Sequence, residues 1–349
     1  MNIIRHPANP ILKIGDVEPS QPCFEVIGVF NAGAISFQGK KILLVRVAEK
    51  PIVQEKQNIP VPIFDRSSGE VRVKLLERSN AEYDFSDPRV IRSKSRQNYL
   101  TSISHIRLAE SEDGVHFTVA RHPLIQAFDE YSAFGVEDAR VTCLGDVYTV
   151  NFSAASELGI ITRLFTTTDF VRFTDLGNIF HPDNKDVAIF PEKINGLYYA
   201  FHRPSTSEYG QPNLWIASSP DLIHWGDHRM VAAVRPGRWD SGRMGASCVP
   251  LKTPKGWLEI YHGATLENRY CLGAMLLDLN EPWKVLARSE TPLLEPAAPY
   301  ETDGFFGNVI FSCGLIQTGD KLDIYYGASD DSVCLAQTAV SEVLNFLKG

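Results

Sequence analysis

Hydrophobic and polar positions recur along the chain in a form typical of short antiparallel strands joined by tight turns. A glycine is followed by about six strand-like residues and then by polar ones in five places, which begin at Gly39, Gly145, Gly196, Gly256 and Gly319. The last four glycines are 51, 60 and 63 residues apart, and a unit of this length holds about four short strands. The repeat predicts an all-β protein folded as a five-bladed β-propeller.

A second motif falls between these strands. SEDGVHF, TTDFVRF and SPDLIHW each place an aspartate in a turn and an aromatic residue four positions later, and LDLNEPW is a looser fourth copy. The pairs are Asp113 and Phe117, Asp169 and Phe173, and Asp221 and Trp225. The motif predicts a strand that runs into an aspartate-closed turn, followed by an aromatic side chain that packs the next strand.

The interval from Gly39 to Gly145 is longer than the others, at 106 residues. Much of the excess lies in residues 49–98, which are rich in charge and proline and weakly periodic, and which we interpret as an insertion over one face. The C-terminal VSEVLNFLKG predicts a short amphipathic helix at most. We therefore expect residues 1–349 to form a single propeller domain with one insertion.

Propeller geometry predicts where chemistry gathers. If the five glycine-started strands are the innermost of their blades, their ends converge on one funnel. The residues at these ends are Arg46, Ser153, His202, Arg203, His262 and Tyr326. Carboxylates join the set in FGVEDAR, where Glu137 and Asp138 are adjacent. Because neighbouring side chains of an extended segment point to opposite sides, we expect at most one of the two to face the site.

Basic residues form a second group, made up of Lys185, Arg203, Arg243 and His262. Such a group is costly to hold together unless an anion neutralises it, and phosphate suits the paired donors of arginine. A sulfate or a substrate carboxylate would also fit. The alternative is that each cation pairs with an acid nearby, for example Arg243 with Asp240.

Composition narrows the function classes. The 349 residues carry 34 Lys and Arg against 42 Asp and Glu, a net charge of −8, so the basic footprint of a nucleic-acid-binding protein is absent. No run of ~20 apolar residues predicts a membrane span. The N-terminus lacks the apolar region of a signal peptide, and the six cysteines form no CxxC pair, so we expect a cytoplasmic protein without a bound metal.

Several segments together resemble glycoside hydrolase family 130, the β-mannoside phosphorylases and related mannosidases. GVEDAR resembles the family's G-x-E-D-P-R signature, with Ala139 where the family usually has proline. NKDVAIFPEKINGLYYAFHRP, GWLEIYHGA and YYGASD also look like family segments, in the family's order. FEVIGVFNAG and LLVRVAEKP resemble the branch that acts on β-1,2-linked mannobiose and oligomannosides.

The resemblance implies a five-bladed propeller and a glycosyltransferase-type phosphorylase. It implies that Asp138 is the general acid, acting through the 3-hydroxyl of the mannose being cleaved, while phosphate attacks with inversion to give α-mannose 1-phosphate. Phosphate is then a co-substrate, and no cofactor is needed. Carried over by position, the phosphate-binding residues are Lys185, Arg203, Arg243 and His262, and the sugar-binding residues are Asn31, Arg46, Asp330 and Tyr270.

Other functions stay open at this point. A β-mannosidase of the same fold would need a carboxylate base about 6.5–9.5 Å from the acid, for which Asp186, Asp240 and Asp330 are the candidates. A β-1,4-mannosyl phosphorylase and a non-catalytic glycan-binding propeller are the remaining alternatives. The acceptor side of the site is expected near residues 49–98, and a further hypothesis is that this insertion packs against a second copy of the chain.

Overall fold

The protein is built almost entirely from β-strands. The computed structural model describes residues 2–52, 57–205 and 209–348. Within these ranges the helical segments are short: a 3-10 turn, η1 (Ile14–Asp16), and two helices, α1 (Pro299–Thr302) and α2 (Val340–Phe346). None of these described helices is long and apolar enough to cross a membrane. The all-β class predicted from the glycine-started repeat is confirmed.

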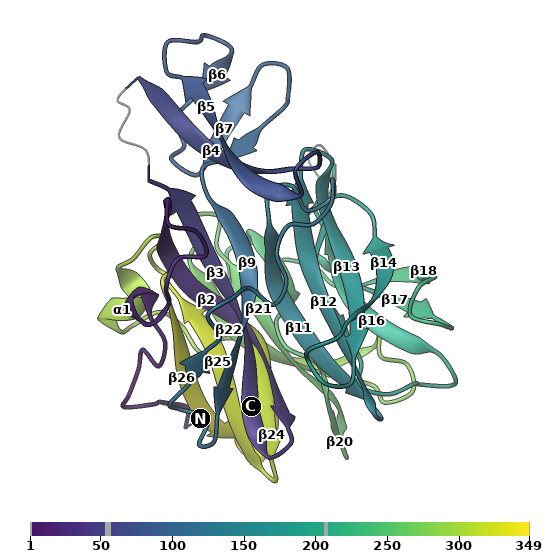
Figure 1. Cartoon of the computed structure of the whole chain (residues 1–349). Coiled ribbons are helices and arrows are strands. Elements are labelled where there is room, and N and C mark those ends of the chain that lie inside the picture. Colours follow the sequence, from purple (N-terminus) through teal and green to yellow (C-terminus); the bar gives the residue numbers. More distant parts are fainter. Residues whose placement is uncertain (1, 53–56, 206–208, 349) are drawn as a thin grey trace.

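Five antiparallel sheets form the body of the molecule (Figure 1). The first contains β2 (Phe24–Phe37), β3 (Lys40–Pro51), β9 (Ile103–Ser111) and β10 (Thr118–Val119). The second contains β11 (Val136–Leu144), β12 (Val147–Ser156), β13 (Gly159–Thr167) and β14 (Thr174–Phe180). The third contains β15 (Asn184–Ile189), β16 (Tyr198–Pro204), β17 (Leu214–Ser219) and β18 (Gly226–Ala232).

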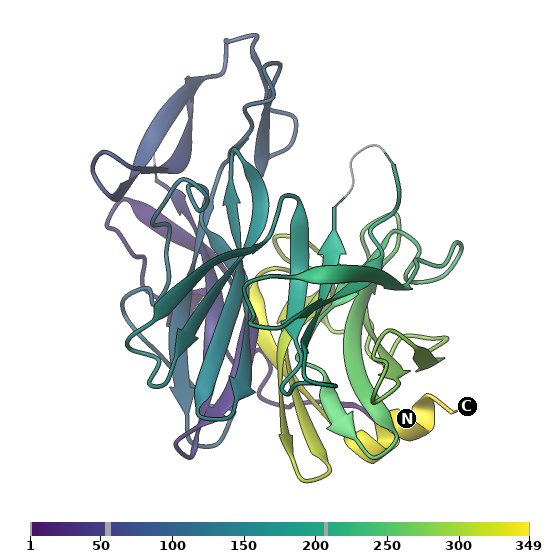
Figure 2. The ribbon, with the colours of Figure 1, turned by 90° about the vertical axis from the view of Figure 1, so that its right-hand side faces the viewer.

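The last two sheets complete the body. The fourth contains β19 (Arg243–Ala246), β20 (Leu251–Thr253), β21 (Gly256–Ala264), β22 (Tyr270–Leu277) and β23 (Val285–Arg288). The fifth contains β24 (Ile310–Thr318), β25 (Lys321–Ala328), β26 (Ser332–Ala339) and, from the other end of the chain, β1 (Ile4–Arg5). Both ends of the chain consequently lie on the same side of the molecule (Figure 2).

Neighbouring sheets contact one another in a closed order. Strand β2 contacts β24 and β11, β15 contacts β11 and β19, and β22 contacts β24, so the fifth sheet meets both the fourth and the first. Five hydrophobic clusters each combine side chains of two adjacent sheets. The first strands of the sheets, β2, β11, β15, β19 and β24, therefore lie toward the centre.

This order corrects one expectation. The glycine-started strands are β3, β12, β16, β21 and β25, and each is the second strand of its sheet rather than the innermost. The reason is that the glycine closes the hairpin that follows the first strand: Gly39, Gly145, Gly196 and Gly319 have φ between 61° and 86°, which glycine adopts without steric cost.

The aspartate motif forms the turns predicted for it. The side chains of Asp113, Asp169 and Asp221 accept hydrogen bonds of 2.8–2.9 Å from the backbone N–H groups two and three residues further on. The aromatic residue that follows packs against an aromatic side chain of a strand. The ring centroids of Trp225 and of Phe180 in β14, for example, are 5.4 Å apart.

The chain between β3 and β9 contributes structure outside the five sheets, whereas residues 49–51 of the expected insertion belong to β3. A hairpin of β4 (Asn58–Asp65) and β5 (Glu70–Glu77) and a small sheet of β6 (Tyr83–Asp84), β7 (Val90–Ser93) and β8 (Tyr99–Leu100) stand at one end of the body (Figure 1). Their own cluster of Val61, Leu76, Ile91 and Tyr99 reaches Phe134 in the body. This segment leaves from β3 and returns into β9, which pair with each other, so the body's first sheet is uninterrupted.

Candidate active site

Two adjoining cavities lie where the first strands meet the segment between β3 and β9. The first, about 440 Å³, is called the charged cavity, and all nine site residues expected from the sequence line it: Asn31, Arg46, Asp138, Lys185, Arg203, Arg243, His262, Tyr270 and Asp330. The second, about 570 Å³, is called the mixed cavity and shares Arg46, Arg89, Lys185 and Asp330 with the first. Residues up to 299 positions apart in the sequence, from Asn31 to Asp330, thus meet around one space.

The residues at the ends of the glycine-started strands divide evenly. Arg46, Arg203 and His262 line the charged cavity, whereas Ser153, His202 and Tyr326 do not. His202 stacks on Phe180 with ring centroids 4.7 Å apart, and Tyr326 donates a 2.8 Å hydrogen bond to Glu301. The prediction from the strand ends was therefore correct for three of its six residues. These strands are second in their sheets and turn alternate side chains away from the centre.

The first strands present their side chains through bulges. The pairing register shifts between Phe30 and Gly33, between Glu137 and Arg140, and between Lys185 and Ala188. Asn31, Asp138 and Asp186 occupy the left-handed region there, with φ of 48°, 52° and 57°. A bulge bends the strand and redirects side chains.

Glu137 and Asp138 face different cavities, in agreement with the expectation that at most one of them faces a given site: Asp138 lines the charged cavity and Glu137 lines the mixed cavity. Arg46 Nη2 lies 2.9 Å from Glu137 Oε1, and its Nη1 lies 3.0 Å from Asp138 Oδ1. Strict alternation of side chains holds only for regular extended backbone, and this strand departs from it at Asp138. One guanidinium therefore ties the two carboxylates together.

Asp138 is buried within a set of hydrogen bonds and charges. Asn31 Nδ2 and Arg46 Nη1 both donate to its Oδ1 over 3.0 Å. Burial acts to raise the pKa of Asp138, but the positive charges of Arg46 and Lys185 outweigh it and hold the pKa below its usual value. In the absence of ligand the carboxyl group is therefore ionised at neutral pH.

Asp330 has the opposite electrostatic character. It lines both cavities and has φ of 51°. Burial, helped by the negative charges of Asp138 and Glu137, raises its pKa to about 6 in spite of the attraction of Arg46. Two carboxylates of one cavity thus differ in their readiness to hold a proton.

The other side of the charged cavity is basic. Arg203 Nε donates a 2.7 Å hydrogen bond to Asp186, and Arg243 Nη2 donates a 3.0 Å hydrogen bond to Asn268. Arg243 Nε and His262 Nε2 are buried and form no hydrogen bond; His262 Nε2 lies 3.2 Å from Asp186 Oδ2, close enough for electrostatic attraction but poorly aligned. Two buried N–H-bearing positions without an acceptor are suited to an anion.

The pairing of Arg243 with Asp240, considered as an alternative, is wrong. Asp240 instead accepts from Arg235 over 2.8 Å and from Arg288 over 2.5 Å, and it does not line the charged cavity. Lys185 also differs from the simple picture of four clustered donors. Its Nζ lies 3.4 Å from Glu137 Oε2, so one of the four expected phosphate donors contacts an acid.

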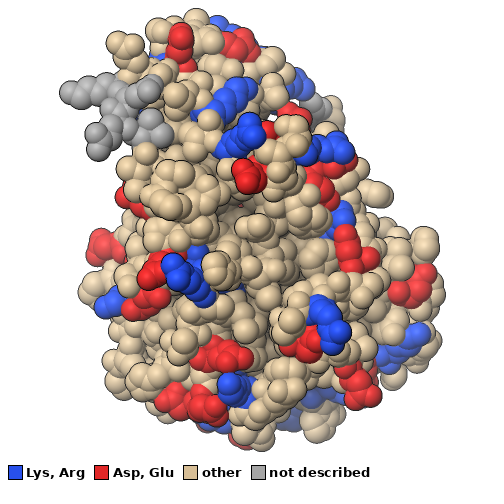
Figure 3. Space-filling view, in the orientation of Figure 1, with Lys and Arg blue, Asp and Glu red and all other residues tan. Residues whose placement is uncertain are grey.

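The basic side chains of the charged cavity lie in the interior. Figure 3 shows basic and acidic side chains interspersed over the visible face, whereas the Arg203 side chain is only 9% exposed and its partner Asp186 is 3% exposed. No group of three or more His, Cys, Asp or Glu side chains suited to a metal ion occurs in the described part of the chain. The site thus combines one buried acid with a pocket of buried N–H donors.

Arg89 and Phe306 line the charged cavity and were missed by sequence reasoning. Arg140 lines neither cavity but connects Asp138 to Ala246 through hydrogen bonds to their carbonyls, and its place in the same signature segment as Asp138 was the available signal. Arg89 lies 4.8 Å from the Phe306 ring and both line the charged cavity. Neither stands in a periodic pattern. Arg89 belongs to residues 49–98, which were expected near the acceptor side, whereas no signal in the sequence marks Phe306.

A buried carboxylate and unpaired buried N–H donors around one cavity form an arrangement suited to proton transfer beside a bound anion, as in an enzyme active site. The chain belongs to glycoside hydrolase family 130: the family's sequence model, described as beta-1,4-mannooligosaccharide phosphorylase, matches residues 88–349.

Individual relatives agree with this assignment. A beta-1,2-mannobiose phosphorylase of Listeria innocua is 52% identical over 351 residues, covering 100% of this chain and 99% of that protein. A solved structure of the Listeria innocua enzyme in complex with beta-1,2-mannobiose has a TM-score of 0.97 and covers 100% of this chain and 99% of that one. A 1,2-beta-oligomannan phosphorylase of Thermoanaerobacter is 35% identical, covering 69% of this chain and 80% of that protein.

Proposed function

We propose that this protein is an inverting β-mannoside phosphorylase that cleaves β-1,2-mannobiose or β-1,2-oligomannan with inorganic phosphate and releases α-mannose 1-phosphate. The observation that carries the proposal is the charged cavity, where Asp138 stands opposite Arg203, Arg243 and His262. Full-length similarity to a beta-1,2-mannobiose phosphorylase supports the linkage.

The proposed roles follow the two sides of the cavity. Asn31, Arg46, Asp330 and Tyr270 bind the mannose that is cleaved, next to Asp138. Lys185, Arg203, Arg243 and His262 bind phosphate, and the unpartnered Arg243 Nε and His262 Nε2 support this half of the assignment. Burial lowers the pKa of His262, so the ring is neutral and acts as a hydrogen-bond donor rather than a cation.

The reaction needs a proton on Asp138 at the moment of cleavage. We propose that bound phosphate raises the pKa of Asp138 and so favours its protonation, because an anion beside Lys185 offsets the positive charge that otherwise lowers this pKa. The proton passes through the 3-hydroxyl of the mannose to the glycosidic oxygen as the C1–O bond breaks. A phosphate oxygen forms the new bond to C1 from the opposite face, and the buried cations hold it in line.

The alternative is a hydrolase of the same fold, and one observation favours it. Of the three carboxylates considered as a base, Asp240 does not line the cavity and Asp186 is occupied by Arg203. Asp330 does line it, and its pKa of about 6 suits a general base. Hydrolysis would release free mannose and would not depend on phosphate.

We further propose that the five sheets are the blades of a five-bladed β-propeller and that residues 1–349 form one domain with an insertion at 49–98. The closed order of sheet contacts and the five inter-sheet clusters support this. Phosphate is a co-substrate and no cofactor takes part. The proposed location is the cytoplasm, in keeping with six free cysteines, and a homo-oligomer remains a hypothesis for sedimentation analysis.

The deciding experiment is product analysis with β-1,2-, β-1,3- and β-1,4-mannobiose, each with and without phosphate. We expect mannose 1-phosphate from the β-1,2 substrate only when phosphate is present. Equal cleavage without phosphate, with free mannose as the product, would establish the hydrolase instead. Asp138→Asn should fold normally and lose activity; full activity in this variant would overturn the assignment of the acid.

A further inference from the structure

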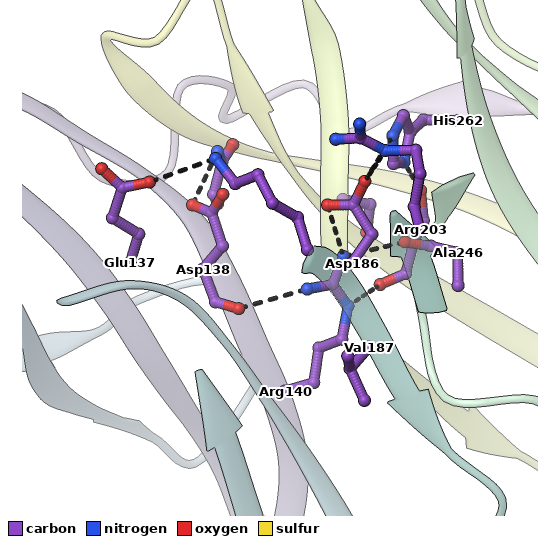
Figure 4. A network of polar contacts seen from close by, with 12 residues as sticks. Glu137, Asp138, Arg140, Asp186, Val187, Arg203, Ala246 and His262 are labelled. Carbon is purple, nitrogen blue, oxygen red and sulfur yellow. Dashed lines mark hydrogen bonds and ion pairs between the residues drawn. The ribbon is translucent and has the colours of Figure 1, made fainter. Parts of the chain in front are cut away.

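Asp186 lies at the base of the basic side and has no role in the proposal so far. Its side chain is 3% exposed, and its backbone has φ of 57° in the bulge of β15. Two groups assigned to phosphate surround it: Arg203 Nε lies 2.7 Å from Oδ2, and His262 Nε2 lies 3.2 Å from the same oxygen (Figure 4). Arg140 Nη2 approaches the other oxygen at 3.8 Å.

The surroundings of this carboxylate are closely packed. A Cβ atom placed on Gly245 would lie 2.4 Å from Asp186 Oδ2 and 2.7 Å from His262 Cε1. Only glycine therefore fits between the carboxylate and β21. Asp186 is held in one position from both sides, by contact with Gly245 and by its ion pairs.

Arg203 is consequently fixed before any ligand binds. Its Nε donates to Asp186 and its Nη1 donates to Ser205 over 3.2 Å. A guanidinium has five N–H donors in one plane, so two contacts fix its orientation and the others remain for an anion. Pre-orientation of this kind saves a flexible side chain the entropy it would otherwise lose on binding.

Arg140 connects this group to the acid. Its Nε and Nη2 donate to the backbone carbonyls of Ser247 and Ala246 over 2.8 Å, and its Nη1 donates to the Asp138 carbonyl over 3.2 Å. Arg140 thus joins the bulge that carries Asp138 to the strand opposite, next to Asp186. The phosphate side and the acid side are parts of one buried network.

We propose that Asp186 is a positioning residue for phosphate: it holds Arg203 in the orientation in which the remaining N–H groups of the guanidinium meet the attacking anion. This inference rests on the proposed function. Asp186 acts through Arg203 and does not touch the reacting atoms. Burial opposes its ionisation, but the positive charge of Arg203 holds the pKa of Asp186 well below its usual value, so the carboxylate is charged at neutral pH.

Asp186→Asn tests the role, since asparagine has the same shape and tolerates the left-handed backbone. The readouts are KM for phosphate, KM for mannobiose and kcat. We expect KM for phosphate to rise at least 10-fold while KM for mannobiose changes less than 2-fold. The matched control is Glu301→Gln, which removes a carboxylate of similar burial that pairs with Arg5 and lines neither cavity, and it should leave both KM values unchanged.

A double-variant cycle tests whether Asp186 acts through Arg203. If it does, Asp186→Asn adds less than 2-fold to the effect of Arg203→Lys on KM for phosphate. If Asp186→Asn fails to fold, Gly245→Ala displaces the carboxylate without removing its charge and should raise KM for phosphate in the same way.

Three results would overturn the inference: an unchanged KM for phosphate with only a lower Tm, an equal rise of both KM values, or independent effects in the cycle. Failure of the proposed function itself is seen separately, in the unmodified enzyme, as cleavage that does not depend on phosphate.

Discussion

Replacing Asp330 with asparagine is expected to change the stability of the folded protein and its enzymatic activity in opposite directions. Asparagine has the same shape as aspartate and adopts the φ of 51° found at this position. The substitution removes a negative charge that burial and the nearby carboxylates Asp138 and Glu137 disfavour. We therefore expect the variant to be more stable than the parent and less active.

The magnitude follows from the pKa. A rise from 3.8 to about 6, at about 1.36 kcal/mol for each pH unit, amounts to about 3 kcal/mol. The protonated form is the one the folded state favours, so the parent loses this stability as pH rises from about 4 to about 6. The neutral variant does not, and its advantage should be absent at pH 4 and complete at pH 7.

Thermal unfolding between pH 4 and pH 8 measures the effect. With an unfolding entropy of about 2.1 cal/mol/K per residue and 349 residues, 3 kcal/mol corresponds to an increase in Tm of about 4 °C at pH 7. The control is Asp331→Asn, at a neighbouring position that does not line the charged cavity, where we expect a smaller change.

A lower Tm for Asp330→Asn at pH 7, or the same increase at pH 4 and pH 7, would refute the electrostatic reasoning. Activity is measured alongside. A charged hydrogen bond to a sugar hydroxyl contributes about 1.5–3 kcal/mol, so kcat/KM for mannobiose should fall about 10- to 100-fold.

Three further substitutions probe the framework of the site. Gly33→Ala puts a Cβ atom 2.4 Å from the carbonyl oxygen of Ala139, so we expect a loss of about 1–3 kcal/mol in chemical denaturation and a loss of activity; a neutral result would mean that the two bulges are not in contact. Asp240→Asn leaves two arginines without their buried partner and should cost about 3 kcal/mol, with KM for phosphate unchanged in the folded fraction. Arg46→Lys cannot reach both carboxylates that the guanidinium joins, and kcat/KM should fall about 100-fold; retention of parental activity would show that the bridge is dispensable.

The repeat identified the strands but not their rank within the sheets. A glycine turn marks where a hairpin closes, and this is the same signal whether the strand that follows is first or second from the centre. The innermost strands have short or irregular hydrophobic patterns because bulges interrupt them, as at Asn31 and Asp138. Sequence periodicity therefore marked the strands that carry Arg46, Arg203 and His262 but not the bulged first strands that carry Asn31 and Asp138.

The predicted site residues agree with the structure better than the strand geometry that was used to predict them. All nine line one cavity, because the signature segments identify positions whatever the local backbone does. Glu137 lines the mixed cavity rather than the charged one, in agreement with the expectation that at most one of the two adjacent acids faces a given site. Arg89 comes from a segment without periodicity, and it lies over the Phe306 ring at the charged cavity.

The pairing of β1 with β26 sets an order on how the chain can fold during synthesis. Arg5 binds Glu301, 296 residues later, and Ile4 pairs with Gln337. At about 5–20 residues per second, the N-terminal strand waits on the order of tens of seconds at the ribosome for its partner to emerge. The fifth sheet is then the last to be completed, and a bulky fusion at the N-terminus would interfere with that final step before it disturbed any of the other four sheets.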